Sequence, residues 1–299
     1  RPSMGAWISY GLGTENANLP SFITINPTLG HGGVGNWASA FLPASHQGTR
    51  IGGGGTPVDK ATIAHLSGAW DPAVQRAQLD LLGDLQREHL GRVGAESALE
   101  ARIESFELAF RMQTEAPDIL SLTGETEATR KLYGLDDPRT ASFARQCLLA
   151  RRFSERGVRF VQITHGYWDQ HEDLTKDHAR LAGEVDRPIA GLLRDLKARG
   201  LLDETLVLWG GEFGRTPTLQ GKDGRDHHPQ GFSAWLAGAA DYRDALQNAD
   251  LAFRDTVLRA CKVERNKMGV PKARSGAFAS VVARGPSKWM SPLSTVSSR

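Results

Sequence analysis

"VRFVQIT" (158–164) opens the stretch that decides the fold, which continues with "DLTKDHARLAGEVDRPIAGLLRDLKARGLL" (173–202) and ends with "TLVLWGG" (205–211). The first and last pieces are short, rich in β-branched and apolar residues, and predict strands. The middle piece has apolar residues at helical spacing, a proline at Pro188 that predicts a kink, and Gly200 as its cap. Strand, helix and strand at this spacing predict a βαβ unit with parallel strands and a right-handed crossover.

The residues before this unit predict a mostly helical layer over 71–157. Asp71 followed by proline is a helix start, because aspartate caps the first N–H groups and proline suits the first helical position. We expect one helix to stop at Pro117 and another at Gly157. On this reading the apolar residues that face the core include Phe106, Phe110 and Met112.

Shorter signals extend the sheet on either side. "FITI" (22–25) and "FSAWLAG" (232–238) predict two more strands, the first within the loop-rich segment 1–58. "TLVLWGG" is continuously apolar, as expected for a strand buried on both faces. "IGGGGTP" (51–57) lacks the lysine of a phosphate-binding loop, so it predicts a flexible surface loop.

Composition excludes several classes of function. A chain of 299 residues with 40% hydrophobic and 23% charged residues is typical of a globular protein, and its net charge of +2 argues against a nucleic-acid partner. No apolar run reaches the roughly 18 residues that a membrane span needs. Cys147 and Cys261 are far apart; Cys147 lies on an apolar helical face and predicts a buried structural thiol.

Polar side chains follow the predicted strands where ligand sites form in open α/β sheets, at the carboxyl ends. The segment after the first strand, the segment after the second, and the loop before the last strand each carry several. They are His165, Trp168, Asp169 and His171; Glu212 and Arg215; and Arg225, Asp226, His227 and His228. Three segments therefore converge on one end of one sheet.

Carboxylates and imidazoles are ligands for zinc, manganese and similar ions. Asp169 and His171, two residues apart on one loop, can chelate a single ion. Glu212 and one histidine of the pair His227–His228 could complete its shell or hold a second ion about 3.5–4 Å away. His227 is favoured, because His228 precedes a proline that restricts it.

Arg215 and Arg225 suit an anionic substrate group, since guanidinium forks match phosphate or sulfate oxygens. Asp226, His165 and Trp168 would line the same substrate site, with Trp168 as a pocket wall. Each residue taken alone also has a non-functional interpretation, such as a hydrogen-bonded turn at Asp169 or a histidine whose imidazole is simply solvated. The convergence, not any one residue, favours a metal or anion site. No G-x-S-x-G serine elbow is present.

The segments "GYWDQH" (166–171), "DRPIAGLLRDLKARGLLDETLVLWGGEFGRTP" (186–217) and "GRDHHPQGFSAWLAG" (224–238) closely resemble the DUF1501 family. "PSMGAWISYGLGTENANLPSFI" (2–23) and "FLPASHQGT" (41–49) resemble its earlier segments, so the resemblance covers about 1–239. These proteins are sulfatase-like members of the alkaline phosphatase superfamily. The resemblance implies an alkaline-phosphatase-like α/β/α sandwich with a mostly parallel central sheet, incomplete at its N-terminus, and divalent ions (zinc, calcium or manganese) at the strand ends.

Residue by residue, the resemblance implies that Asp169 and His171 are the superfamily's Asp…His metal pair and that His227 or His228 is its later histidine ligand. Glu212 stands where relatives carry an Asp-His pair, a departure that bears on ordinary two-metal hydrolysis. In the superfamily a hydroxyl nucleophile attacks the ester, and no residue of this sequence is identifiable in that role.

The ends of the sequence differ from the family's pattern. Family members normally begin with a twin-arginine export signal and a first strand, neither of which is present here, so we expect a fragment of a periplasmic or secreted protein. We predict a partial α/β domain over 1–240. Residues 241–299 are a divergent basic segment, expected to be poorly ordered or packed differently from the family.

These observations predict a metal-dependent hydrolase of sulfate or phosphate esters, with a sulfated or phosphorylated carbohydrate as the kind of substrate. The alternative is a non-catalytic cell-envelope protein that keeps the fold and the metal and binds polysaccharide or partners. The product of a damaged gene, without function, is a third reading. Hydrolysis assays separate the first two.

Overall fold

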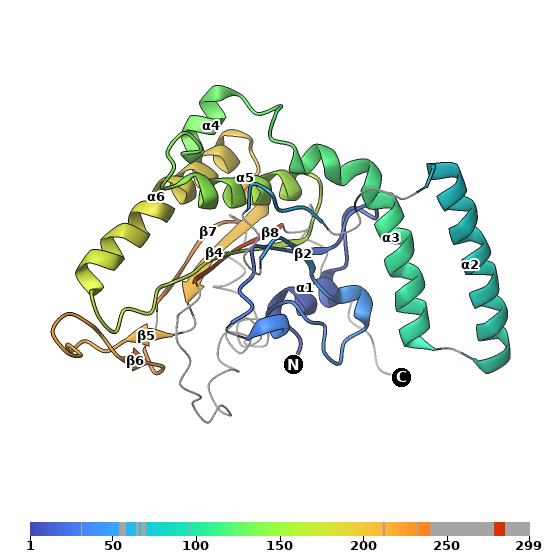
Figure 1. Cartoon of the computed structure of the whole chain (residues 1–299), viewed down its shortest axis with the longest axis horizontal. Coiled ribbons are helices and arrows are strands. Elements are labelled where there is room, and N and C mark those ends of the chain that lie inside the picture. The colour runs from blue at the N-terminus through green and yellow to red at the C-terminus, as the bar shows by residue number, and fades with distance from the viewer. Residues whose placement is uncertain are drawn as a thin grey trace, which may run out of the picture.

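In the computed structural model, the strand–helix–strand unit forms as the sequence predicts, and it is the centre of the molecule (Figure 1). The structure describes residues 1–30, 32–53, 58–63, 66, 70–94, 96–211, 213–231, 233–239 and 278–284. The helices are α1 (Met4–Leu12), α2 (Pro72–Val93), α3 (Ser97–Leu120), α4 (Glu127–Tyr133), α5 (Ala141–Glu155) and α6 (Leu174–Ala198), with short 3₁₀ turns η1 (Gly33–Asn36), η2 (Ala44–His46) and η3 (Leu202–Glu204). The strands are β1 (Phe22–Ile25), β2 (Thr49–Ile51), β3 (Phe160–His165), β4 (Thr205–Gly211), β5 (Gly214–Arg215), β6 (His227–His228), β7 (Ala234–Gly238) and β8 (Phe278–Arg284).

The main sheet is mixed, with its described strands in the order β2-β1-β3-β8-β4-β7. β1 pairs in parallel with both β2 and β3. β8 pairs antiparallel with β3 and also with β4, so β3 and β4 run in the same direction, as predicted for the βαβ unit. They are not neighbours, however, because β8 lies between them. The α/β class is confirmed; β1 to β4 share one direction, whereas β7 and β8 run the opposite way.

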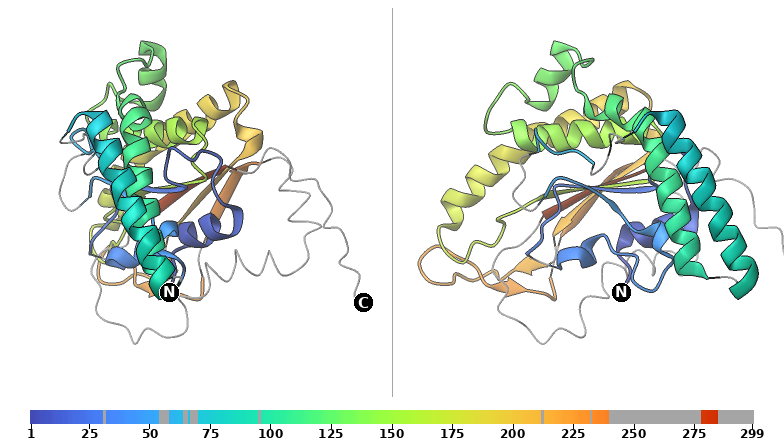
Figure 2. Two further views of the ribbon diagram at one scale, coloured as in Figure 1. Left: turned by 90° about the vertical axis from the view of Figure 1, so that its right-hand side faces the viewer. Right: turned by 45° about the vertical axis from the view of Figure 1, so that its right-hand side comes forward.

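The helices α5 and α6 lie on one face of this sheet, and the short helix α1 lies on the other, against β1 and β3 (Figures 1 and 2). Because side chains alternate along a strand, Ile23 of β1 and Val161 of β3 join the main core with α5 and α6. Phe22 and Phe160 point the other way and pack edge-to-face, with ring centroids 5.2 Å apart, in a smaller cluster that includes Met4 of α1. β3 is therefore packed between α5 on one face and α1 on the other, and the loop after β3 starts from a buried strand.

The helical layer over 71–157 is confirmed as α2 to α5. The Asp71 side chain accepts a hydrogen bond from the N–H of Ala73, which makes it the expected cap. Gly157 ends α5 with φ of 81°, a conformation that favours glycine. The helix over 173–202 is confirmed as α6, which continues through Pro188 without interruption.

The prediction that α3 stops at Pro117 was wrong, because the helix runs one turn further to Leu120. This last turn buries Ile119 and Leu120 in the core. Its carbonyl groups, which have no helical partners, accept hydrogen bonds from arginines of α5: Arg152 donates to the carbonyl of Ile119 and Arg145 to that of Leu120. Burial and these donors outweigh the hydrogen bond that proline removes.

The core-facing prediction is confirmed for Met112, which is 5% exposed, and is wrong for Phe106, which is 43% exposed. The reason lies in the tertiary arrangement: α2 and α3 form a hairpin at the side of the sheet (Figure 2), so only part of the apolar surface of α3 meets the body of the molecule. Phe110 is half-buried and packs under the guanidinium of Arg76 of α2, 5.2 Å from its ring centroid.

The expectation that β4 is buried on both faces was also wrong. Only Thr205 and Val207 of the strand are buried. Val207 belongs to the main core under α5 and α6, whereas Leu208 lies on the other face and is only partly buried. On that face the short helix α1 contacts β1 and β3. Among the described residues, α1 therefore does not extend far enough to bury β4.

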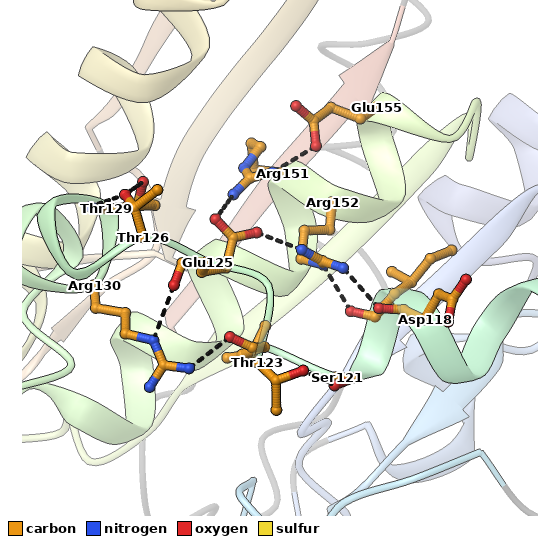
Figure 3. A network of polar contacts seen from close by, with 12 residues as sticks. Asp118, Ser121, Thr123, Glu125, Thr126, Thr129, Arg130, Arg151, Arg152 and Glu155 are labelled. Carbon is orange, nitrogen blue, oxygen red and sulfur yellow. Dashed lines mark hydrogen bonds and ion pairs between the residues drawn. The ribbon is translucent and has the colours of Figure 1, made fainter.

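An ionic network ties α5 to its neighbours (Figure 3). The Arg151 side chain, 2% exposed, lies within ion-pair distance of three carboxylates: Glu125 at 2.8 Å, Glu155 at 2.5 Å and Asp195 of α6 at 3.0 Å. The Tyr133 hydroxyl of α4 donates to Asp195 at 3.0 Å, and burial is the main cause that raises the pKa of this phenol. Such a network fixes α6 on α5, and the N-terminal end of α6 lies beside the candidate site.

Cys147 is fully buried, as predicted, and burial raises the pKa of its thiol. None of the described helices combines the length and the apolar character needed to cross a bilayer. Cys261 and part of the glycine-rich loop (54–57), which was predicted to be a flexible surface loop, lie outside the described residues. Of the segment 241–299, the structure describes only β8, which is an inner strand of the sheet.

Candidate metal centre

Three side chains from two distant loops meet beyond the end of β3. Asp169 and His171 come from the loop between β3 and α6, and His227 comes from β6. His227 Nε2 lies 2.9 Å and His171 Nε2 3.1 Å from Asp169 Oδ1, and the two imidazole nitrogens are 3.1 Å apart. This is the one group of potential metal-binding side chains in the described part of the chain.

The triangle of donor atoms has the dimensions of a metal site. With zinc–nitrogen bonds of 2.0–2.1 Å, ligand atoms of a tetrahedral centre lie roughly 3.3 Å apart, close to the observed separations. Asp169 Oδ1, His171 Nε2 and His227 Nε2 therefore need to spread by only a few tenths of an ångström around an ion. Two imidazoles and one carboxylate would fill three positions and leave a fourth for water or substrate.

His171 is held in the orientation that a ligand requires. Its Nδ1 lies 2.7 Å from the side-chain oxygen of Gln220, which can only accept, so Nδ1 carries a proton. In the neutral ring, Nε2 then keeps the lone pair that a metal ion needs. Metal-binding histidines commonly donate their other N–H in this way. Gln220 was not singled out by the sequence reasoning, since no local pattern connects it to His171.

The second loop reaches the first because Gly224 has no side chain. A Cβ at this position would lie 1.8 Å from the carbonyl oxygen of His171, well inside van der Waals contact. The neighbouring Asp223 anchors the same loop to the start of α6, where its carboxylate accepts hydrogen bonds from the N–H and hydroxyl of Thr175 at 3.1 and 3.0 Å. A glycine in a polar turn was the only sequence signal for this contact.

His228 is not part of the group, although it is adjacent to His227. Successive residues of a strand point to opposite sides, so the two rings of β6 diverge. The ring of His228 lies beside Gly231, where an added Cβ would be 2.6 Å from its Nδ1. The ring of His227 instead lies next to those of His171 and Phe213, with centroids 4.8 and 4.6 Å away. Glu212, the remaining predicted ligand, lies outside the described residues.

The predicted anion-binding arginines make contacts within the protein. Arg215 donates to Asp169 Oδ1 at 2.5 Å and to the carbonyl of Trp168 at 3.0 Å. Arg225 donates to the carbonyl of Thr216 at 3.2 Å. Their position beside the donor triangle agrees with the predicted convergence, and the Arg215 contact neutralises the carboxylate. Asp226 is exposed and accepts a hydrogen bond from the N–H of His227.

A hydrogen bond joins the side chains of His165 and Trp168, the two residues that were predicted to contact substrate. The indole N–H of Trp168 donates to His165 Nδ1 at 2.9 Å, and His165 Nε2 lies 2.9 Å from Glu184 of α6. Burial is the main cause that lowers the pKa of His165, partly offset by Glu184. His178 of α6 is exposed, and its ring packs edge-to-face with that of Trp168, with centroids 5.2 Å apart.

With this geometry in view, comparison with known proteins gives one result. The family model described as "Protein of unknown function (DUF1501)" matches residues 1–240. The match covers well over half of the chain, so the chain belongs to the DUF1501 family. Neither the curated proteins nor the solved structures contain a match.

Proposed function

We propose that this member of the DUF1501 family is a metal-dependent hydrolase that acts on phosphate or sulfate esters, with Asp169, His171 and His227 as its metal ligands. The observation that supports the proposal is the donor triangle with edges of 2.9–3.1 Å. Three protein ligands with an open fourth position are typical of catalytic zinc sites, whereas structural zinc sites have four.

The donor set favours zinc among the candidate ions. Calcium prefers six to eight oxygen ligands, and manganese also favours carboxylates and water. Two imidazole nitrogens beside one carboxylate oxygen suit zinc better. A bound zinc ion would supply Lewis-acid polarisation of an ester oxygen and lower the pKa of water near it.

The chain's own residues prepare the site. Gln220 fixes the tautomer of His171, and Arg215 holds the carboxylate of Asp169. Arg215 donates to Oδ1, the same Asp169 oxygen that belongs to the donor triangle. Because each carboxylate oxygen has two lone pairs, Oδ1 can accept from Arg215 with one of them and offer the other to an ion. Arg215 also places positive charge at the donor triangle, and Arg225 lies two residues before His227. Their charge would attract a phosphate or sulfate group and stabilise charge that develops on its oxygens.

The proposal includes an alkaline-phosphatase-like sandwich, an extracytoplasmic location and a phosphorylated or sulfated carbohydrate as substrate. These parts rest on the family resemblance. Helices on both faces of the sheet are compatible with a sandwich (Figure 2).

A second candidate is a non-catalytic binding protein. It is favoured by the Arg215–Asp169 ion pair, which satisfies the carboxylate without any ion; the two side chains are 19% and 8% exposed. On this reading the cluster stabilises two loops that form a binding surface. The two candidate functions share the same fold, and only the hydrolase would turn over a phosphate or sulfate ester.

The test uses the full chain, stripped with a chelator and reloaded with zinc. We expect about one zinc ion per chain and zinc-dependent hydrolysis of an aryl phosphate or aryl sulfate. His227→Gln should lose most of the zinc, whereas His228→Gln, altered at the adjacent position, should retain it. Bound zinc without turnover of either ester would leave the binding protein as the better reading, and absence of zinc binding would refute the metal site.

A further inference from the structure

The hydrogen bonds of His165 determine where its proton lies. An indole N–H can only donate, so His165 Nδ1, 2.9 Å from Trp168 Nε1, must be the acceptor. The proton of the neutral ring is therefore on Nε2, and it points at the carboxylate of Glu184, 2.9 Å away. Protonation of Nδ1 would break the bond to Trp168.

The surroundings of His165 hold this arrangement in place. Its side chain is 12% exposed, and the ring packs edge-to-face on Phe143 of α5, with centroids 5.3 Å apart. The other oxygen of Glu184 accepts from Arg180 of α6 at 2.7 Å, so the carboxylate cannot turn away freely. Burial disfavours the charged imidazolium and lowers its pKa, which keeps Nδ1 available as an acceptor.

The same hydrogen-bonded chain leads on to the donor triangle. Trp168 accepts a hydrogen bond at its carbonyl from Arg215 Nη2, and that nitrogen also donates to Asp169 Oδ1. The indole thus fixes one end of the short segment that carries Asp169 and His171, while Arg215 fixes the other side.

We propose that Trp168, His165 and Glu184 are positioning residues that hold the loop after β3 so that Asp169 and His171 meet His227. Glu184 orients His165, His165 accepts the indole N–H, and the indole fixes the backbone next to Asp169. This inference rests on the metal site proposed above. It assigns His165 and Trp168 a role through the loop, in place of contact with substrate.

The experiment compares the zinc affinities of three variants, a matched pair at Glu184 and one at Trp168, measured by competition with a chromophoric chelator. Glu184→Leu removes the acceptor for His165, whereas Glu184→Gln keeps an oxygen that can accept from Nε2–H. We expect Glu184→Leu and Trp168→Phe to lower zinc affinity about 10- to 100-fold, the range typical of groups that orient ligands, and Glu184→Gln to remain near wild type. Unfolding temperatures in chelator identify variants that simply fold less well.

Nuclear magnetic resonance of the imidazole nitrogens gives an independent readout in the zinc-free protein. We expect His165 as the neutral Nε2–H form in the wild type, and altered His171 and His227 signals in Trp168→Phe. Unchanged zinc affinity in Trp168→Phe and Glu184→Leu would overturn the inference. If the wild type binds no zinc, the proposed function fails separately, and unchanged His171 and His227 signals in Trp168→Phe would then overturn the positioning role.

Discussion

Substitution of Gly224 by alanine tests the candidate site most directly, because it changes one atom at the contact between the two loops. An added Cβ would lie 1.8 Å from the His171 carbonyl oxygen and 3.0 Å from the backbone nitrogen of Glu172. Ordinary contact begins at 3.4 Å, so the loops must separate by about 1.6 Å. Metal–ligand distances tolerate only about 0.2 Å, so His171 and His227 can no longer share an ion without further rearrangement.

We expect Gly224→Ala to lower zinc affinity by at least 10- to 100-fold, which corresponds to about 1.4–2.8 kcal/mol. Separation of the loop from α6 also breaks the hydrogen bond by which the Asp223 carboxylate caps the N–H of Thr175, and such a cap stabilises the fold by about 1 kcal/mol. The unfolding temperature, measured in chelator so that no zinc contributes, should therefore fall by a few degrees. Zinc affinity is measured by competition titration and stability by thermal unfolding monitored by circular dichroism.

The matched control is Gly91→Ala, since an added Cβ on this residue of α2 would meet no other atom within 4 Å. It should leave zinc affinity unchanged and stabilise the helix slightly, by up to about 1 kcal/mol. Wild-type zinc affinity in Gly224→Ala would refute the reasoning, because it would mean that the two loops do not need to approach this closely for the site to form.

Three further predictions concern buried groups. Arg151→Met should destabilise the fold by about 3 kcal/mol, lowering the unfolding temperature by roughly 6–12 °C, because it leaves buried Glu125 and Asp195 with fewer partners; an unchanged temperature would contradict this. The Cys147 thiol should react with Ellman's reagent only after denaturation, and rapid labelling of the native protein would contradict its burial. Burial lowers the pKa of His165 in the folded protein, so the unfolded chain binds a proton at this ring more readily. The contribution of the neutral His165 to the free energy of unfolding is therefore complete above about pH 6.5, the ordinary pKa of histidine, and is lost as pH falls through the lower pKa of the folded state. Thermal unfolding from pH 5 to 8 should show this loss in the wild type and less of it in His165→Gln.

The candidate site was predictable in outline for a physical reason. Polar residues that follow parallel strands emerge at the same edge of a sheet, and β3 and β4 do run in the same direction. Asp169, His171 and His227 were accordingly expected near one another, and the structure places them in contact. The contacts of Gln220 with His171 and of Glu184 with His165 could not be predicted, since the two residues of each pair are 49 and 19 positions apart in the chain and meet only through folding.

By itself the sequence determined the local elements: the cap at Asp71, the end of α5 at Gly157, and the strand–helix–strand pattern from β3 to β4. These depend on interactions within a few residues, which periodicity and capping chemistry describe well. Only the tertiary structure decided that β8 separates β3 from β4, and that His227 rather than His228 faces Asp169. Both outcomes depend on pairing between distant segments: strand pairing sets the order of a sheet, and the register of a two-residue strand selects which of two adjacent histidines points at the site.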